Sequence, residues 1–133
     1  MICKHPIQIF FALLLTLASA IGCSQDEGKG GRALLTGKVF VRDFNSSGIL
    51  KDEFYGPEVR VYLIYGNDAI YGDDMDTHYD GSYRFEYLQP GNYTIFAYSQ
   101  CDTCAGGTKP VFLDTLITDS KQIVVMPDLV IND

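Results

Sequence analysis

The chain has 133 residues, of which 47% are hydrophobic, and its 17 acidic and 10 basic side chains give a net charge of −7. This length fits one compact domain with its own core. The acidic balance disfavours nucleic acid as a partner, because phosphate binding needs a clustered basic face.

The first 22 residues have the three parts of a secretory signal. Lys4 precedes an apolar run over residues 7–22, which closes on the small residues Ala-Ser-Ala. The run is interrupted by Gln8 and Thr16 and is shorter than the roughly 20 strongly apolar residues that span a bilayer. We therefore expect residues 1–22 to be removed on export.

The next feature is Ala-Ile-Gly-Cys at residues 20–23, which resembles the lipobox of bacterial lipoproteins. Ala20 stands where that motif usually has leucine, and an ordinary signal peptide cut after Ala20 is the alternative. The resemblance implies that Cys23 is acylated and becomes the first residue of the mature protein. Two or three acyl chains, at about 0.8 kcal/mol per buried methylene, form a stable anchor. We expect a protein of the bacterial cell envelope, lipid-anchored to the outer membrane.

Residues 23–32 are acidic and rich in glycine, a composition that predicts a flexible tether. Asp26 and Glu27 follow the cysteine closely and resemble the export tags of Bacteroidetes lipoproteins, which implies exposure at the cell surface. A merely soluble linker is the alternative.

From residue 33 onward, apolar and polar residues mostly alternate, which indicates strands. The expected strands are 33–42, 58–65, 69–72, 82–88, 93–98, 111–116 and 122–131, with a break at Pro127. Seven short strands with Gly, Asn, Asp and Pro turns favour an all-β domain over 33–133, an antiparallel seven-stranded Greek-key β-sandwich. Its expected core is Val39, Val41, Val61, Leu63, Tyr83, Phe85, Tyr93, Ile95 and Val125.

Residues 80–95 read Asp-Gly-Ser-Tyr-Arg-Phe-Glu-Tyr-Leu-Gln-Pro-Gly-Asn-Tyr-Thr-Ile. This segment resembles the signature of carboxypeptidase regulatory-like and collagen-adhesin B-type domains, in which a DG turn leads a Y-x-F strand and a PG turn leads a Y-T strand. The resemblance implies a prealbumin-like sandwich. It implies little about function, because these domains occur as spacers, stalks and regulatory appendages.

A possible calcium site lies in residues 43–53, which are similar to the D-x-N-x-D-G loop of Gram-positive surface adhesins. Calcium needs six or more oxygen ligands. The candidates are Asp43, Asn45, Ser47, the carbonyl group of Ile49, and Asp52 or Glu53. Lys51 occupies the ninth position and Phe54 the twelfth, where a bidentate Glu is expected. A solvated turn without metal is therefore the alternative.

Cys101 and Cys104 are the thiols that remain beyond Cys23. In an exported protein this spacing predicts a disulfide that closes a small loop. Reduced thiols, or thiol-redox or metal chemistry, are the alternatives. A zinc site needs two further ligands, and the mature chain has a single histidine, His78.

Four apolar residues fall on strand positions opposite the expected core: Tyr62, Ile64, Phe96 and Tyr98. Either a second layer covers them or they form an exposed contact patch. The sequence offers no catalytic set of residues. We expect a non-catalytic binding, adhesion or structural module that meets a glycan, a peptide or another envelope protein. The alternative is a small thiol-redox or metal-dependent protein that uses Cys101 and Cys104.

Overall fold

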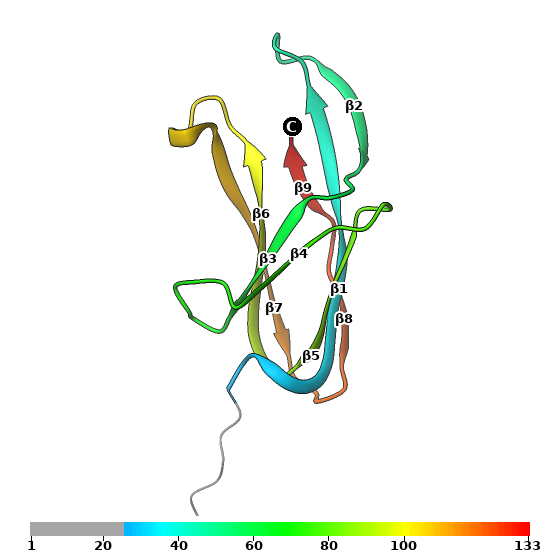
Figure 1. The fold of residues 1–133 in the computed structure, drawn as a ribbon, viewed down its shortest axis with the longest axis vertical. Helices are drawn as coiled ribbons and strands as arrows, with labels where there is room; N and C mark the ends of the chain where they lie inside the picture. Colours follow the sequence, from blue (N-terminus) through cyan, green and yellow to red (C-terminus); the bar gives the residue numbers. More distant parts are fainter. Residues whose placement is uncertain (1–25) are drawn as a thin grey trace, which may run out of the picture.

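The computed structural model describes residues 26–133, so the expected signal peptide and Cys23 lie outside the described range. Two β-sheets form this part of the chain, and its one helical element is the single 3-10 turn η2 (Ala105–Gly107) (Figure 1). The all-β prediction is confirmed. The described residues form nine strands, where the sequence predicted seven.

The first sheet is built around β1 (Lys29–Phe44). One edge of β1 pairs antiparallel with β5 (Ser82–Leu88) and then with β2 (Leu50–Tyr55). The other edge pairs in parallel with β8 (Ile123–Val125) and β9 (Leu129–Asn132), so the expectation of purely antiparallel pairing was wrong. The reason is the path of the chain, which reaches β8 by crossing over from the second sheet instead of turning back in a hairpin.

The second sheet has the strand order β4-β3-β6-β7 and is antiparallel throughout. Its strands are β4 (Asp73–Asp76), β3 (Arg60–Tyr65), β6 (Gly91–Gln100) and β7 (Thr108–Ile117). The sheet lies against the first one, and the hydrophobic core fills the space between them.

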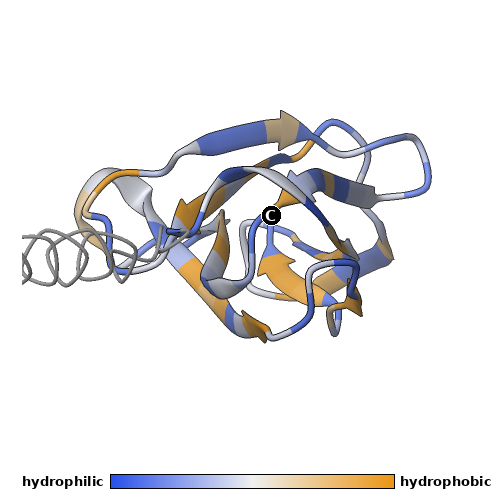
Figure 2. Ribbon diagram, turned by 90° about the horizontal axis from the view of Figure 1, so that it is seen from below, coloured by the Kyte–Doolittle hydropathy of each residue, from blue (hydrophilic) through white to orange (hydrophobic). Residues whose placement is uncertain are grey.

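The core follows the alternation of side chains along each strand, and hydrophobic and hydrophilic residues alternate along the ribbons in Figure 2. Of the nine core residues expected, all but Val125 are buried. Val125 is 74% exposed, and that prediction was wrong. Val124 faces the core from β8, and Met126 packs there just after it. The inward and outward positions of this strand are therefore the reverse of those predicted.

Several strand boundaries differ from the prediction. The strand at 82–88 is confirmed, and the segment 122–131 divides near Pro127 into β8 and β9 as expected. Residues 69–72 do not form a strand, and β4 follows them instead. Strand β2 was not predicted.

The domain begins earlier than residue 33. Gly28 is buried, its N–H group donates to the Tyr93 hydroxyl at 2.9 Å, and its carbonyl group accepts the Gln89 N–H at 2.8 Å. A Cβ atom at Gly31 would lie 2.0 Å from the Leu88 carbonyl oxygen. Residues 23–32 were expected to form a tether, but from Gly28 onward their glycines permit close packing against the domain. Strand β1 starts at Lys29.

Candidate functional site

A row of aromatic side chains crosses the outer face of the second sheet. The pairing of β3, β6 and β7 places Phe96 between Tyr62 and Phe112. The rings of Tyr62 and Phe96 stack at 4.8 Å with 14° between their planes, and Phe112 lies 5.4 Å from Phe96. Tyr98 stands edge-on to Phe96 at 5.7 Å. The outer face of this sheet is thus aromatic where a solvated face would be polar.

The loop between β3 and β4 adds a wall to this face. Tyr71 packs on Tyr62 with ring centroids 4.7 Å apart, and Ala69 and Ile70 lie beside it. Together with the aromatic row, the loop encloses a groove of about 290 Å³. We call this the aromatic groove, and its lining is Ile64, Ala69, Ile70, Tyr71, Phe96, Tyr98, Pro110 and Phe112.

The predicted contact patch therefore comes together. Ile64, Phe96 and Tyr98 line the groove, and Tyr62 stacks on Phe96 as its neighbour on the next strand. Sequence reasoning missed the contributions of the 69–71 loop and of Phe112. The apolar run at 69–71 could have indicated the loop's contribution, but it was interpreted as a strand. The position of Phe112 depends on how β7 pairs with β6, which the sequence does not give.

The groove is apolar inside and polar at its edge. None of its eight lining side chains is charged. At the edge, Arg60 pairs with Asp74 at 2.8 Å and with Asp76 at 3.0 Å across β3 and β4. The Thr94 hydroxyl donates to Asp114 at 2.6 Å across β6 and β7. An apolar centre within a polar rim is the usual anatomy of a protein-binding surface.

Residues 43–53 form the β1–β2 hairpin and its tight turn. The Asn45 side-chain oxygen accepts the N–H groups of Ser47 and Ile49, both at 2.9 Å, and Gly48 has a φ of 76° that favours glycine. The carbonyl group of Ile49 accepts the Asn45 N–H at 2.9 Å. Two of the proposed calcium ligands are thus engaged in holding the turn.

The acidic candidates in this segment have their own partners. Asp43 lies 3.8 Å from the Lys51 ammonium group, and the Arg42 guanidinium group donates to Glu53 at 3.0 Å. Asp52 accepts the Glu53 N–H at 2.8 Å. Within the described residues, no three His, Cys, Asp or Glu side chains are grouped so that they could hold a metal ion. The six candidate ligands therefore do not surround a common point where a calcium ion could bind.

Cys101 and Cys104 form a disulfide bond, with their Cα atoms 5.3 Å apart. The bond lies in the β6–β7 loop, where the Cys104 N–H donates to the Cys101 carbonyl group at 3.1 Å. The Cys101 N–H in turn donates to the carbonyl group of Gly107 at 2.9 Å. These contacts make the loop a compact, rigid turn.

The hairpin turn and the disulfide loop meet at one end of the sandwich. Asn45, Ser46 and Gly48 from the first and Asp102 from the second line the same cleft, together with the end of β9. The structure thus joins two segments that the sequence pattern had treated separately.

Most of the shifted pKa values belong to packing and to turns. Burial raises the pKa of Tyr83, and it raises those of Tyr65 and Tyr93 as well. At the turn before β5, the hydroxyl and N–H groups of Ser82 donate to Asp80 and lower its pKa. Over residues 26–133, no helix has the length and apolar character needed to cross a membrane.

Comparison with known proteins gives a remote structural likeness and no family. No family model matches the sequence, and no curated protein is significantly similar to it. Among solved structures, the chain is similar to a Pseudomonas aeruginosa protein proposed to bind carbohydrate, with 15% identity and a TM-score of 0.46. The match covers 75% of this chain and 90% of the other. Because this likeness is remote, function has to be argued from the chain's own residues.

Proposed function

We propose that this protein is a lipid-anchored, non-catalytic binding module of the bacterial envelope, whose aromatic groove contacts a protein partner. One observation carries the proposal: an uncharged groove of aromatic and aliphatic side chains lies on the outer face of a sheet. Tyr98 and Phe112 are each about half exposed there, at 51% and 53%. Contiguous exposed apolar surface of this kind marks interaction sites.

The lining favours apolar side chains of a protein over a sugar as the ligand. Tyr62 and Phe96 stack on each other, so these two ring faces are not free to receive a sugar ring. The groove also lacks amide and carboxylate side chains to hydrogen-bond hydroxyl groups, and its own hydroxyl groups come from Tyr71 and Tyr98. Aromatic pockets with a polar rim are where binding hot spots concentrate.

The anchor in this proposal is Cys23, which precedes Gly28, the first packed residue, by five residues. Five residues span at most about 18 Å. The folded domain would therefore sit within about 18 Å of its lipid anchor. A binding module held so close to the membrane is suited to partners that are themselves in the envelope.

A matched pair of substitutions on β7 tests the role of the groove. Phe112 and Leu116 lie on the same face of the strand and are 53% and 52% exposed, and Leu116 lies outside the groove. Envelope proteins captured by the purified protein would be titrated against both variants. Phe112→Ala should weaken binding at least tenfold, the loss expected for a hot spot, and Leu116→Ala less than twofold. Equal effects of the two substitutions, or no binding of any envelope protein, would refute the proposal.

A further inference from the structure

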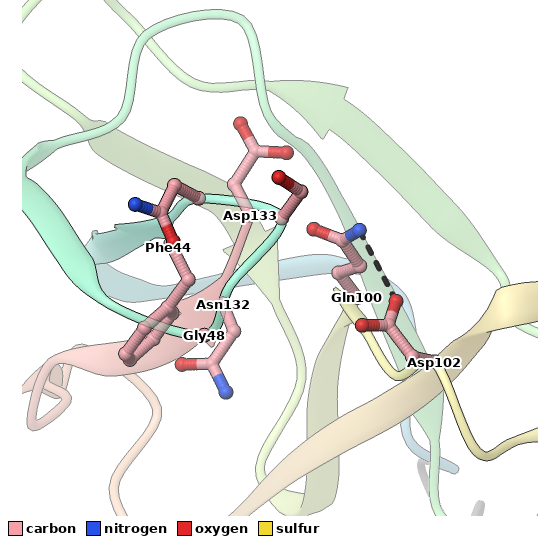
Figure 3. A pocket seen from close by; sticks show the side chains of 8 residues that line it. Phe44, Gly48, Gln100, Asp102, Asn132 and Asp133 are labelled. Atoms are coloured by element: carbon pink, nitrogen blue, oxygen red, sulfur yellow. Dashed lines mark hydrogen bonds between the residues drawn. The ribbon is translucent and has the colours of Figure 1, made fainter.

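A second hollow lies between the two sheets at the end of the sandwich that is farthest from Gly28. The β1–β2 hairpin, the β6–β7 loop and the end of β9 gather there (Figure 1). We call it the far-end cleft. Its main part has a volume of about 620 Å³, within the range of small-molecule sites. Figure 3 labels six of its lining residues, Phe44, Gly48, Gln100, Asp102, Asn132 and Asp133.

The walls of the far-end cleft are held by contacts that need no ligand. The Asn45 side chain fixes the hairpin turn, and the disulfide fixes the loop that carries Asp102. Strand β9 is tied on both sides, because the Asn132 N–H donates to the Ser99 hydroxyl and the Phe44 N–H to the Asp133 carbonyl group, each at 2.8 Å. A preformed site of this kind loses little conformational freedom on binding.

The polar side chains of the cleft can both donate and accept hydrogen bonds. The amides of Gln100 and Asn132 offer both kinds of group, and Asp102 and Asp133 add carboxylate acceptors. Gln100 and Asp102 lie close together on one wall, across from Asn132 and Asp133, and are joined by a long hydrogen bond of 3.4 Å (Figure 3). No Lys, Arg or His lines the cleft, so an anionic ligand would meet only like charge.

An apolar part of about 410 Å³ adjoins the polar one and shares Gln100, Asn132 and Asp133 with it. Its lining includes the rings of Phe54 and Tyr98, which are 38% and 51% exposed. The far-end cleft therefore offers hydrogen-bonding groups beside an apolar surface. A sugar ring has the complementary character, since hydroxyl groups surround its rim and C–H groups cover its faces.

We propose that the far-end cleft is a second binding site and that its ligand is a neutral saccharide. Hydroxyl groups of the sugar bind Gln100, Asp102 and Asn132, and a C–H face packs against the apolar part. This site goes beyond the proposed protein contact and shares one residue, Tyr98, with the aromatic groove.

The test is an NMR titration of the ¹⁵N-labelled purified protein. Cellotriose, maltotriose and chitotriose are the neutral probes, and trigalacturonate is the acidic one. At least one neutral probe should shift the amide signals of residues 45–49, 100–104 and 131–133. Trigalacturonate should leave these signals in place, because Asp102 and Asp133 repel its carboxylates.

Three substitutions test which side chains bind the neutral probe. Gln100→Ala and Asn132→Ala should each weaken binding of the neutral probe about tenfold, since each removes a hydrogen bond to a hydroxyl group. Asn92→Ala, the same residue type at the opposite end of the sandwich, should bind as the unmodified protein does. All three side chains are exposed, and thermal melting checks that the variants stay folded.

Several results would overturn the proposal. These are no binding of any neutral probe, equal binding of trigalacturonate, unchanged affinity in both cleft variants, and binding that EDTA abolishes. A loss of binding in Phe112→Ala but not in Gln100→Ala would move the sugar to the aromatic groove. Because the protein-partner experiment compares Phe112 with Leu116, and neither residue lines the far-end cleft, the two proposals can fail separately.

Discussion

Tyr83 lies fully buried in the core, and its hydroxyl group has no hydrogen-bond partner among residues 26–133. The ring stands against β1, where a Cβ atom at Gly37 would come within 2.4 Å of the Tyr83 hydroxyl oxygen. A glycine at residue 37 is thus required by close packing. Tyr93 is equally buried, but its hydroxyl group accepts the Gly28 N–H at 2.9 Å and donates to the Gln89 carbonyl group at 2.5 Å.

The two tyrosines therefore predict opposite responses to the same substitution. Tyr83→Phe should leave the free energy of unfolding unchanged or raise it by about 1 kcal/mol, because a buried polar group without a partner is removed. Tyr93→Phe should lower it by about 1–3 kcal/mol, because the Gly28 N–H loses its partner. Urea denaturation of both variants measures the difference. A larger loss in Tyr83→Phe than in Tyr93→Phe would contradict this account.

Tyr83 also predicts how stability changes at alkaline pH. Burial raises the pKa of its hydroxyl group in the folded protein, whereas the unfolded chain loses that proton near the ordinary value of about 10. The folded state then binds more protons than the unfolded state above about pH 10, so stability is constant below that pH and falls above it. Urea midpoints measured from about pH 8 to about pH 11 should show this slope, and Tyr83→Phe should reduce it, with Tyr65 and Tyr93 contributing the remainder. Tyr79→Phe, at a ring that is 91% exposed, is the control.

At the scale of elements, the prediction succeeded where a strand carries a clear two-residue period. Strand β5 is such a case, since Tyr83 and Phe85 point inward and its bounds match the expected 82–88. It failed for β2, whose six residues are all exposed, because the strand has no buried face to leave a pattern. It also failed for the side-chain phase of β8, since three residues are too few to define one.

The candidate site was predictable only in part for the same reason. The alternation along β3 and β6 identified the outward row of Tyr62, Ile64, Phe96 and Tyr98. The 69–71 loop and Phe112 reach that row through register and loop packing, which are long-range contacts. Strand β4 is acidic and lies outside the predicted strands, but main-chain pairing with β3 and the two ion pairs of Arg60 hold it at the sheet edge.

The disulfide loop predicts a modest effect of reduction. Only Asp102 and Thr103 lie between the two cysteines, so the loop-entropy relation gives about 2 kcal/mol of stabilisation, less than the roughly 3 kcal/mol for a 15-residue loop. Cys101→Ser/Cys104→Ser should unfold at slightly lower urea concentration and stay folded in water. Turnover of insulin or glutathione disulfides by the purified protein, or complete unfolding on reduction, would contradict a structural bridge. Thiol titration with and without reductant checks that the disulfide is present in the purified protein.

At the scale of the whole molecule, β1 is the element that connects the two ends. Its part from Ala33 to Phe44, after the irregularity in which Lys29 and Ala33 both pair with Leu88, extends over about 40 Å to the far-end cleft. An anchor at Cys23 would therefore hold the hairpin and the disulfide loop away from the membrane.

The anchor itself predicts a specific processing defect. A globomycin-type inhibitor of the lipoprotein signal peptidase should leave the precursor uncut, and Cys23→Ala should release or mislocalise the product, because an acylated Cys23 would be the site of anchoring. Immunoblots of membrane and soluble fractions measure both effects. Normal cleavage with the inhibitor present and in Cys23→Ala would show that the signal is of the ordinary kind.

The central position of β1 determines how the molecule would bear mechanical load. In the proposed arrangement, a pull between the lipid anchor and a ligand in the far-end cleft would run along this strand, and β1 is bonded to β5 and β2 on one edge and to β8 and β9 on the other. Because inter-strand hydrogen bonds lie across the strands, such a pull shears many of them together instead of opening them one at a time. Strand β1 would therefore resist separation of the two ends of the domain, which is the load that an anchored surface protein holding a ligand in flowing medium would have to bear.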